Sequence, residues 1–380
     1  MQESRALKGN VESARIVPLS PAAASVRKPR ALKVTLIVAV ALALMMFDLL
    51  LMGTSAGAWA FAIAIVLALV PLPYYVALGL WADRYEPESY RLLLMTFLWG
   101  AGVAAFLAGI LNSAGTSIVV ESLGEDTGEF YGGSISAPIV EEGLKGAILF
   151  ILWWRTTAIN SVLDGIIFAL MSGLGFAFVE EISYYSREAA EGGFPAAFTH
   201  FIFRGLLLGL MHPVFTALTG IGIGLAVVSR RNAVKWIAPA AGLVAAMLLH
   251  SLHNSMAGNY IELQYWLLVP LTFFTLIGIV VMSLRRQAKI VREHVPPDVL
   301  PPDEAERLFS IRGRISDFVK ALRQGGFHGI RARDEYVRAI SELAWQRYHA
   351  ARPAASPERQ PSEVEASYRE RLRRVQQSST

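Results

Sequence analysis

Apolar runs long enough to cross a membrane recur along the first three quarters of this 380-residue chain. About 20 residues of helix span the roughly 30 Å of hydrocarbon in a bilayer. The runs are continuous rather than alternating, which excludes a membrane barrel. The sequence therefore predicts an all-α, polytopic membrane bundle of about eight transmembrane helices. They are expected over residues 34–53, 58–81, 91–112, 135–154, 161–184, 200–229, 236–257 and 264–284.

The composition agrees with a membrane protein and excludes several other classes. Hydrophobic residues make up 54% of the chain and charged residues only 17%, whereas a soluble protein has about 25% charged residues. Cysteine is absent, so a disulfide framework and thiolate chemistry are excluded. The chain has no phosphate-binding glycine loop and no nucleic-acid signature. We therefore expect the lipid bilayer, and no nucleic acid, as a partner.

Charge predicts three parts of the chain and their orientation. Residues 1–32 are expected to form a disordered cytoplasmic arm, residues 33–284 the transmembrane domain, and residues 285–380 a cytoplasmic polar helical tail. Lys and Arg concentrate in the loops on one side of the predicted spans, which the positive-inside rule places in the cytoplasm. Both termini are therefore expected to be cytoplasmic, in a bacterial inner membrane. The tail helices are expected over residues 305–324, 334–349 and 362–375.

Ionisable side chains inside four of the spans carry the functional signal. Such groups cost roughly 2.5–3.5 kcal/mol each at the centre of a membrane helix, and they mark functional sites. At 1.5 Å of rise per residue, they lie about 6–10 Å or somewhat more below the outer edge of the membrane. A shared level predicts one site near the outer face. Its members are Glu141, Glu142, Lys145, Glu180, His212, His250, His253 and Asn254.

Asp164 and Pro213 have other expected roles. Asp164 opens the fifth span at the cytoplasmic end, about 24 Å along the helix from Glu180, which indicates a helix cap. Pro213 follows His212 and removes one backbone hydrogen bond, so a kink is expected there.

Carboxylates and imidazoles in one wet pocket are suited to the activation of water. A glutamate can take the proton of water that attacks an amide, and His or Asn can donate hydrogen bonds to the oxyanion. The same groups can instead hold Zn²⁺. The expected ligands would be Glu141, Glu180, His212 and His250, from separate helices because no HExxH pattern is present. Metal-free activation of water by a glutamate stays open.

Four short motifs resemble those of the PrsW-type intramembrane proteases, which are related to CAAX prenyl endopeptidases. Residues 141–145 fit the EExxK motif and residues 176–180 fit FxxxE. His212, with the Phe-Thr-Ala-Leu that begins at Phe215, is similar to the third motif, and residues 250–254 fit HxxxN. The resemblance covers roughly residues 75–284. Glu181 and His253 depart from the pattern, because an Asn and an aromatic residue are commoner at these positions.

The resemblance implies roles for the candidate residues. Glu141 would be the leading general base or ligand, supported by Phe176 and Lys145. His253, which departs from the family pattern, is expected to support the site as an additional imidazole. The other catalytic residues would be Glu142, Glu180, His212, His250 and Asn254.

We therefore expect an intramembrane endopeptidase, a PrsW-like hydrolase and metalloprotease. It would cleave a single-span or otherwise membrane-anchored protein near the outer membrane face and so initiate transmembrane signalling. Two alternatives remain open, a proton- or ion-coupled transporter and a catalytically silent membrane scaffold.

Overall fold

A computed structural model describes residues 31–257, 263–350 and 370 of the chain. These residues form helices and no strand, which confirms the all-α fold class. The predicted arm over residues 1–32 lies outside the described part except for its last two residues, and the predicted helix over 362–375 lies outside it except for residue 370. The helices are α1 (Ala31–Ala56), α2 (Ala58–Leu69), α3 (Leu72–Ala82), α4 (Tyr90–Leu98), η1 (Trp99–Ala104), α5 (Ala105–Leu123), α6 (Glu125–Tyr131), η2 (Gly132–Ser136), α7 (Ala137–Arg155), α8 (Val162–His200), η3 (Phe201–Leu207), α9 (Met211–Val228), α10 (Asn232–Ala257), α11 (Leu263–His294), α12 (Pro302–Leu308) and α13 (Ile311–Ala350).

Six helical stretches of the described chain are long and apolar enough to cross a membrane. One of them, Val162–Val228, is 67 residues long, about three times the length of a single crossing, and contains the predicted fifth and sixth spans. The predicted fourth span corresponds to α7. This helix is not among the six because it carries Glu141, Glu142, Lys145 and Arg155. Each predicted span falls mainly on helical residues, although residues 58–81 are divided between α2 and α3 and residues 200–229 are interrupted before α9. Six stretches rather than eight meet the apolarity requirement. The six are Val34–Ala56, Ala58–Ala82, Tyr90–Leu123, Val162–Val228, Asn232–Met256 and Trp266–His294.

Helices α8 and α9 run antiparallel and pack closely against each other. Glycine residues allow this close approach of the two backbones. A Cβ atom added at Gly165 would collide with the backbone carbonyl of Gly220, and a Cβ at Gly220 with the carbonyl of Gly165. Further along the pair, a Cβ at Gly173 would collide with the backbone of Pro213. This pairing shows that the 67-residue stretch folds back on itself, and it places the first half of α8 alongside α9, so that Glu180 in the middle of α8 lies near the start of α9.

The chain before α9 is not a regular helix. Residues 201–207 form a π-helix, and residues 208–210 are non-helical. The interruption expected at Pro213 therefore lies a few residues earlier. Pro213 itself sits in the first turn of α9, where the missing N–H would have no helical partner in any case. This irregular stretch, residues 201–210, ends two residues before His212.

The capping role expected of Asp164 is confirmed. Ser161 caps α8 by accepting from the Asp164 backbone N–H at 3.2 Å, and the Asp164 carboxylate accepts from the Ser161 N–H at 2.8 Å. Reciprocal bonds of this kind satisfy amides that would otherwise lack partners at a helix start.

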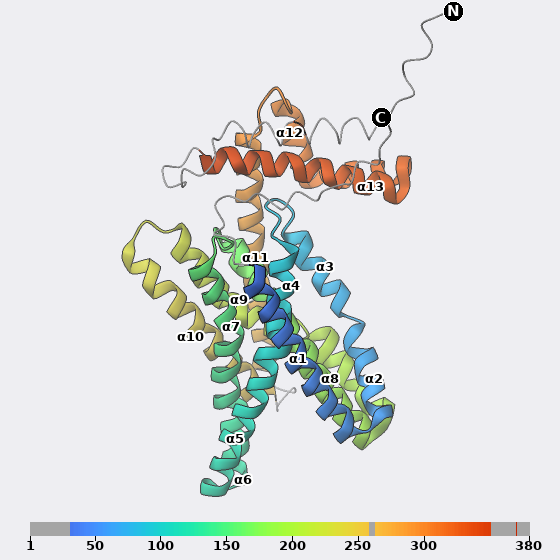
Figure 1. The fold of residues 1–380 in the computed structure, drawn as a ribbon, viewed down its shortest axis with the longest axis vertical. Helices are drawn as coiled ribbons and strands as arrows, with labels where there is room; N and C mark the ends of the chain where they lie inside the picture. Colours follow the sequence, from blue (N-terminus) through green and yellow to red (C-terminus); the bar gives the residue numbers. More distant parts are fainter. Residues whose placement is uncertain (1–30, 258–262, 351–369, 371–380) are drawn as a thin grey trace, which may run out of the picture.

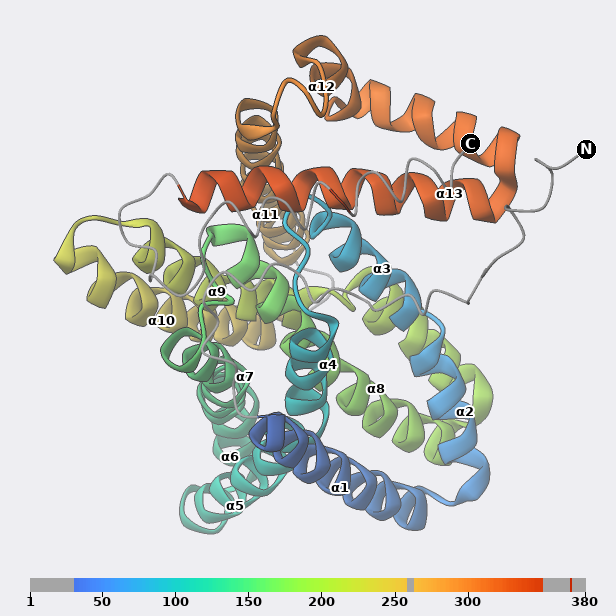
Figure 2. The same cartoon turned by 45° about the horizontal axis from the view of Figure 1, so that its top comes forward.

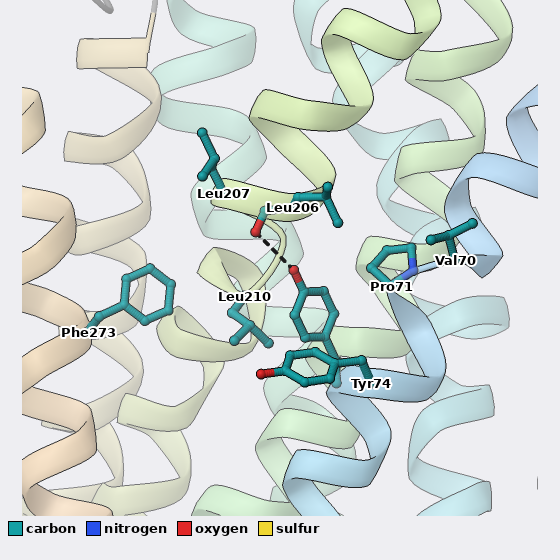
Figure 3. A pocket seen from close by; sticks show the side chains of 8 residues that line it. Val70, Pro71, Tyr74, Leu206, Leu207, Leu210 and Phe273 are labelled. Carbon is teal, nitrogen blue, oxygen red and sulfur yellow. Dashed lines mark hydrogen bonds between the residues drawn. The ribbon is translucent and has the colours of Figure 1, made fainter.

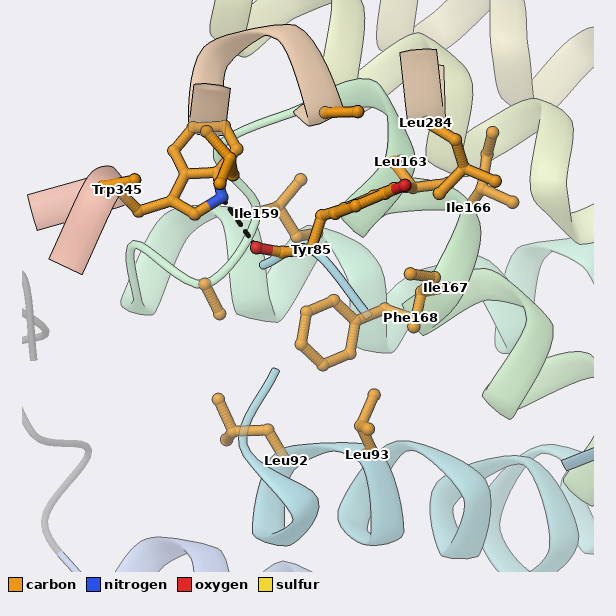
Figure 4. Close-up of a cluster of buried hydrophobic side chains, with 14 of the residues drawn as sticks. Tyr85, Leu92, Leu93, Ile159, Leu163, Ile166, Ile167, Phe168, Leu284 and Trp345 are labelled. Atoms are coloured by element: carbon orange, nitrogen blue, oxygen red, sulfur yellow. Dashed lines mark hydrogen bonds between the residues drawn. The ribbon is translucent and has the colours of Figure 1, made fainter. Parts of the chain in front are cut away.

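The tail packs on one end of the bundle and shares its hydrophobic core. Helix α11 continues past residue 284 to His294, and α13 lies across the spans at that end (Figure 1). The indole Nε1 of Trp345 donates to the backbone carbonyl of Tyr85 at 2.8 Å. Figure 4 shows these two side chains in one cluster with Phe168 of α8 and Leu284 of α11. The division of the chain into a transmembrane domain over residues 33–284 and a cytoplasmic tail over residues 285–380 stays a prediction.

Substituting Ala for Gly220 should destabilise the bundle, because the added methyl meets backbone that cannot move unless α8 and α9 separate. Overpacking of this kind typically costs about 1–3 kcal/mol. Thermal unfolding in detergent measures the loss. Gly109→Ala in α5 is the matched control, since nothing lies within 4 Å of its added methyl. Equal melting temperatures for the two variants would contradict the close packing.

Candidate active site

Four helices bring buried or half-buried ionisable side chains together. Helix α7 contributes three of them, and α8, α9 and α10 contribute one each. Glu142 and Lys145 have no exposed surface, and Glu141 and His250 have 5% and 1%. The members of this cluster are Glu141, Glu142, Lys145, Glu180, His212 and His250.

Lys145 is the cation at the centre of the cluster. Its Nζ lies 2.6 Å from Oε1 of Glu142, 3.6 Å from Oε2 of Glu141 and 3.2 Å from Nδ1 of His212. The ring of Phe176 lies beneath the same ammonium, with 4.3 Å between Nζ and the ring centroid. Residues three and four apart on a helix share a face, so Lys145 meets both glutamates of the preceding turn.

Both oxygens of Glu142 are occupied. Oε1 faces Lys145 and accepts from Nδ1 of His250 at 3.1 Å, while Oε2 accepts from the Thr216 hydroxyl at 2.8 Å. A carboxylate with this many donors is held in one orientation. These contacts fix Glu142 against His250 and Thr216. The catalytic role expected of Glu142 stays a prediction.

Glu141 differs from Glu142 in having an available oxygen. Its Oε1 accepts from the Asn112 amide at 3.4 Å, but its buried Oε2 has no hydrogen bond among the described residues. That Oε2 lies 4.0 Å from Nδ1 of His212 and 4.0 Å from Nε2 of His250. A buried, unsatisfied carboxylate oxygen is costly, and here it faces two imidazole nitrogens.

The partners of the two histidines set which ring nitrogen carries the proton. Nε2 of His212 lies 2.6 Å from Oε2 of Glu180, and Nδ1 of His250 lies 3.1 Å from Oε1 of Glu142. Because a carboxylate accepts hydrogen bonds, each of these nitrogens is the donor. The opposite nitrogen of each ring is then an acceptor. Nδ1 of His212 accepts from Lys145 at 3.2 Å, and this nitrogen and Nε2 of His250 each lie 4.0 Å from Oε2 of Glu141.

This arrangement fits a metal ion. Glu141, His212 and His250 each offer one ligand atom, and the three atoms lie within 4.8 Å of one another. Carboxylate oxygen and imidazole nitrogen are usual zinc ligands, and carboxylates on the opposite ring nitrogens are the usual support of metal-bound histidines. The fourth expected ligand, Glu180, is not in this group and supports His212 instead. A bound ion would replace the hydrogen bond between Lys145 and His212.

Arg204 of η3 forms ion pairs with both adjacent carboxylates of α8, Glu180 and Glu181. Its Nη2 lies 2.7 Å from Oε2 of Glu180, and its Nε lies 3.1 Å from Oε1 of Glu181. Glu180 therefore contacts both His212 and Arg204, whereas Glu181 pairs with Arg204. Sequence reasoning missed Arg204, although an arginine in the apolar run 200–229 is the same signal that drew attention to Glu141.

The remaining predicted residues lie at the edge of the cluster. The Asn254 amide donates to the backbone carbonyl of Gly133 at 2.9 Å, and the Ser251 hydroxyl donates to that of Ser134 at 2.5 Å. These bonds attach α10 to the π-helix η2, which directly precedes α7. His253 packs against Phe215, with 5.4 Å between ring centroids. The catalytic role of Asn254 and the supporting role of His253 stay predictions.

An apolar groove borders the irregular stretch before His212. It has a volume of about 490 Å³ and lies between α3, this stretch and α11. The Tyr75 hydroxyl donates to the carbonyls of Gly205 and Leu206 at 2.8 and 3.2 Å, and so holds one wall (Figure 3). Its lining residues are Val70, Pro71, Tyr74, Tyr75, Leu206, Leu207, Leu210 and Phe273.

Comparisons with known proteins agree with the geometry. The family described as PrsW family intramembrane metalloprotease matches residues 88–283, just over half of the 380-residue chain. Protease PrsW of Bacillus subtilis (strain 168) is 27% identical over 198 residues, which are 52% of this chain and 84% of that protein. No solved structure matches the chain.

Replacing Lys145 with Met should strongly destabilise the protein, because it leaves the buried Glu142 without its cation. Breaking a buried ion pair from one side costs about 3–5 kcal/mol. Thermal unfolding of Lys145→Met, Glu142→Gln and the double variant in detergent measures the coupling. The double variant should lose much less stability than the two single losses together. Strictly additive losses would contradict the pairing.

Proposed function

Because the chain belongs to the PrsW family of intramembrane metalloproteases, we propose that it hydrolyses a peptide bond at Glu141, His212 and His250. One observation carries the proposal. Oε2 of Glu141, which lies 3.6 Å from Nζ of Lys145 and accepts no hydrogen bond among the described residues, is 4.0 Å from a nitrogen of each histidine. A site of this kind, buried among helices of a membrane protein, has what hydrolysis needs: a proton acceptor and two positioned imidazoles.

In the proposed reaction, water attacks the carbonyl carbon of the scissile bond. Glu141 accepts a proton from that water and returns it to the departing amine, so the peptide bond breaks and one water is consumed. Glu142 and Glu180 keep His250 and His212 in the orientation that directs a lone pair inward. A zinc ion bound to Glu141, His212 and His250 would supply a Lewis acid for the carbonyl and would acidify water. Glu141 would then be a ligand rather than the base.

The proposed substrate is a single-span or otherwise membrane-anchored protein. The groove between α3 and α11 is apolar and borders the stretch that ends two residues before His212. This position supports approach of a substrate from the surrounding lipid. Glu141 lies in the first turns of α7, whereas Leu152 near the other end of that helix belongs to the core that includes the tail. The position of Glu141 supports cleavage close to the membrane face opposite the tail.

The cellular setting is part of the same proposal. The Lys and Arg distribution supports a multi-pass protein of the bacterial inner membrane with both termini in the cytoplasm. Cleavage near the outer face would then release part of an anchored regulatory protein and start a signal across the membrane.

Glu141→Gln should abolish cleavage while preserving the fold, since the amide keeps the shape of the carboxylate but cannot accept the proton. Loss of a general base typically lowers the rate about 10²–10⁴-fold. Mass spectrometry of protein termini in host membranes compares this variant with the wild type. Glu121→Gln, the same change at an exposed position of α5, is the control and should stay active. If the new protein termini produced by cleavage are as abundant in Glu141→Gln as in the wild type, the proposed role of Glu141 is wrong.

Protein equilibrated with zinc and then desalted should retain about one ion per chain, as measured by elemental mass spectrometry. Glu141→Gln and His250→Ala should lose it, because each removes one of three ligands. His328→Ala, at an exposed histidine of the tail, should keep it. If metal-free protein still cleaves in the presence of a chelator, the proposed zinc requirement is wrong. Direct activation of water by Glu141 would then be the mechanism.

A further inference from the structure

The first part of α13 presents an apolar stripe away from the protein. The helix turns back at Gly326, which has a φ of 55°. Before this turn, four large apolar side chains are exposed by 61%, 43%, 38% and 44%. They are Ile315, Phe318, Val319 and Leu322. Their spacing of three and four residues places them on one face of the helix.

The contacts of Asp317 show which way this stripe points. The carboxylate of Asp317 pairs with Arg307 at the end of α12, at 3.4 Å. In Figure 1, α12 lies on the side of α13 that is remote from the membrane spans. At 3.6 residues per turn, Ile315, Val319 and Leu322 lie roughly 140–160° around the helix from Asp317. The stripe therefore faces the membrane side.

Two contacts hold α13 against residues at or between the ends of two candidate membrane spans. The Arg314 guanidinium lies 4.9 Å from the ring centroid of Tyr85, in the loop between the span ending at Ala82 and the span starting at Tyr90. After the turn, Arg338 donates to the Tyr90 hydroxyl at 2.8 Å. In Figures 1 and 2 the turn of α13 extends sideways beyond α3, away from the bundle.

The charge of this segment matches an anionic surface. Residues 311–325 contain four basic side chains and one acidic side chain, Asp317. Three of the basic residues, Arg312, Lys320 and Arg323, are exposed. A helix with an apolar face and a basic rim binds at the interface of anionic lipid, with its apolar face about 5–10 Å deep.

We propose that residues 311–325 form an interfacial helix that inserts its apolar stripe into the membrane leaflet on the tail side. Ile315, Phe318, Val319 and Leu322 lie among the acyl chains near the headgroups. Arg312 and Arg323, which lie within roughly 100° of Ile315, Val319 and Leu322 around the helix, bind anionic phosphates. A second copy of the chain fits this face less well, because two basic rims would oppose each other. The segment lies outside residues 88–283 that match the protease family, and the inference does not depend on hydrolysis.

The absence of cysteine makes the test direct. Single cysteines at position 318 or 322 of the full-length protein are labelled with an environment-sensitive fluorophore in proteoliposomes of phosphatidylglycerol and phosphatidylcholine. Quenching by a nitroxide on the acyl chain then reports depth. Gln324→Cys is the matched control, because Gln324 is exposed on the same helix and lies roughly 20° from Asp317, on the face opposite the stripe.

Labels at 318 and 322 should be quenched and blue-shifted, and the label at 324 should not. Removing phosphatidylglycerol, or replacing Arg312 and Arg323 with Gln, should weaken the quenching at 322, and high salt should act in the same direction. Equal exposure of all three labels to water would overturn the proposal. Disulfide cross-linking of two chains through position 322, without lipid quenching, would overturn it in favour of a dimer interface.

Discussion

The buried ammonium of Lys145 is the charge on which the rest of the site depends. Three carboxylates and two imidazoles cannot be buried in one membrane protein without a compensating charge. Lys145 supplies it, at 2.6 Å from Glu142, 3.6 Å from Glu141 and 3.2 Å from His212. Arg204 has the same function at Glu180 and Glu181. The two cations divide the acidic side chains into pairs. Among the described residues, Oε2 of Glu141 lies beside Lys145 and both histidines but accepts no hydrogen bond.

The close packing of helices then determines which groups meet. Glycines let α8 and α9 touch along their backbones, which sets the register that places Glu180 against His212. The bonds from Ser251 and Asn254 to η2 set the register of α10, which places His250 against Glu142. Irregular backbone is tolerated at membrane depth where it lines a cavity or packs on protein. The stretch between Arg204 and His212, beside the apolar groove, is such a case.

The tail is part of the same structure rather than a separate appendage. Trp345, Tyr85 and Phe168 share one core, so the position of α13 is tied to the spans that carry the site. An interfacial helix in α13 would use the bilayer itself to hold the bundle at a defined depth. The depth of the bundle sets the depth of Glu141, and therefore which part of an anchored substrate can reach it.

Composition and helical rise were enough to predict the helical class, most of the membrane spans, the capping contact of Asp164 and the grouping of Glu141, Glu180, His212 and His250. These features depend on local composition and on the fixed rise of a helix. The packing of the helices was needed to show that Glu180 rather than Glu181 contacts His212, that Arg204 belongs to the cluster, and that one oxygen of Glu141 accepts no hydrogen bond among the described residues. Those outcomes depend on how each helix is rotated about its axis and on contacts between segments far apart in the chain. Periodicity within one helix carries no information about either.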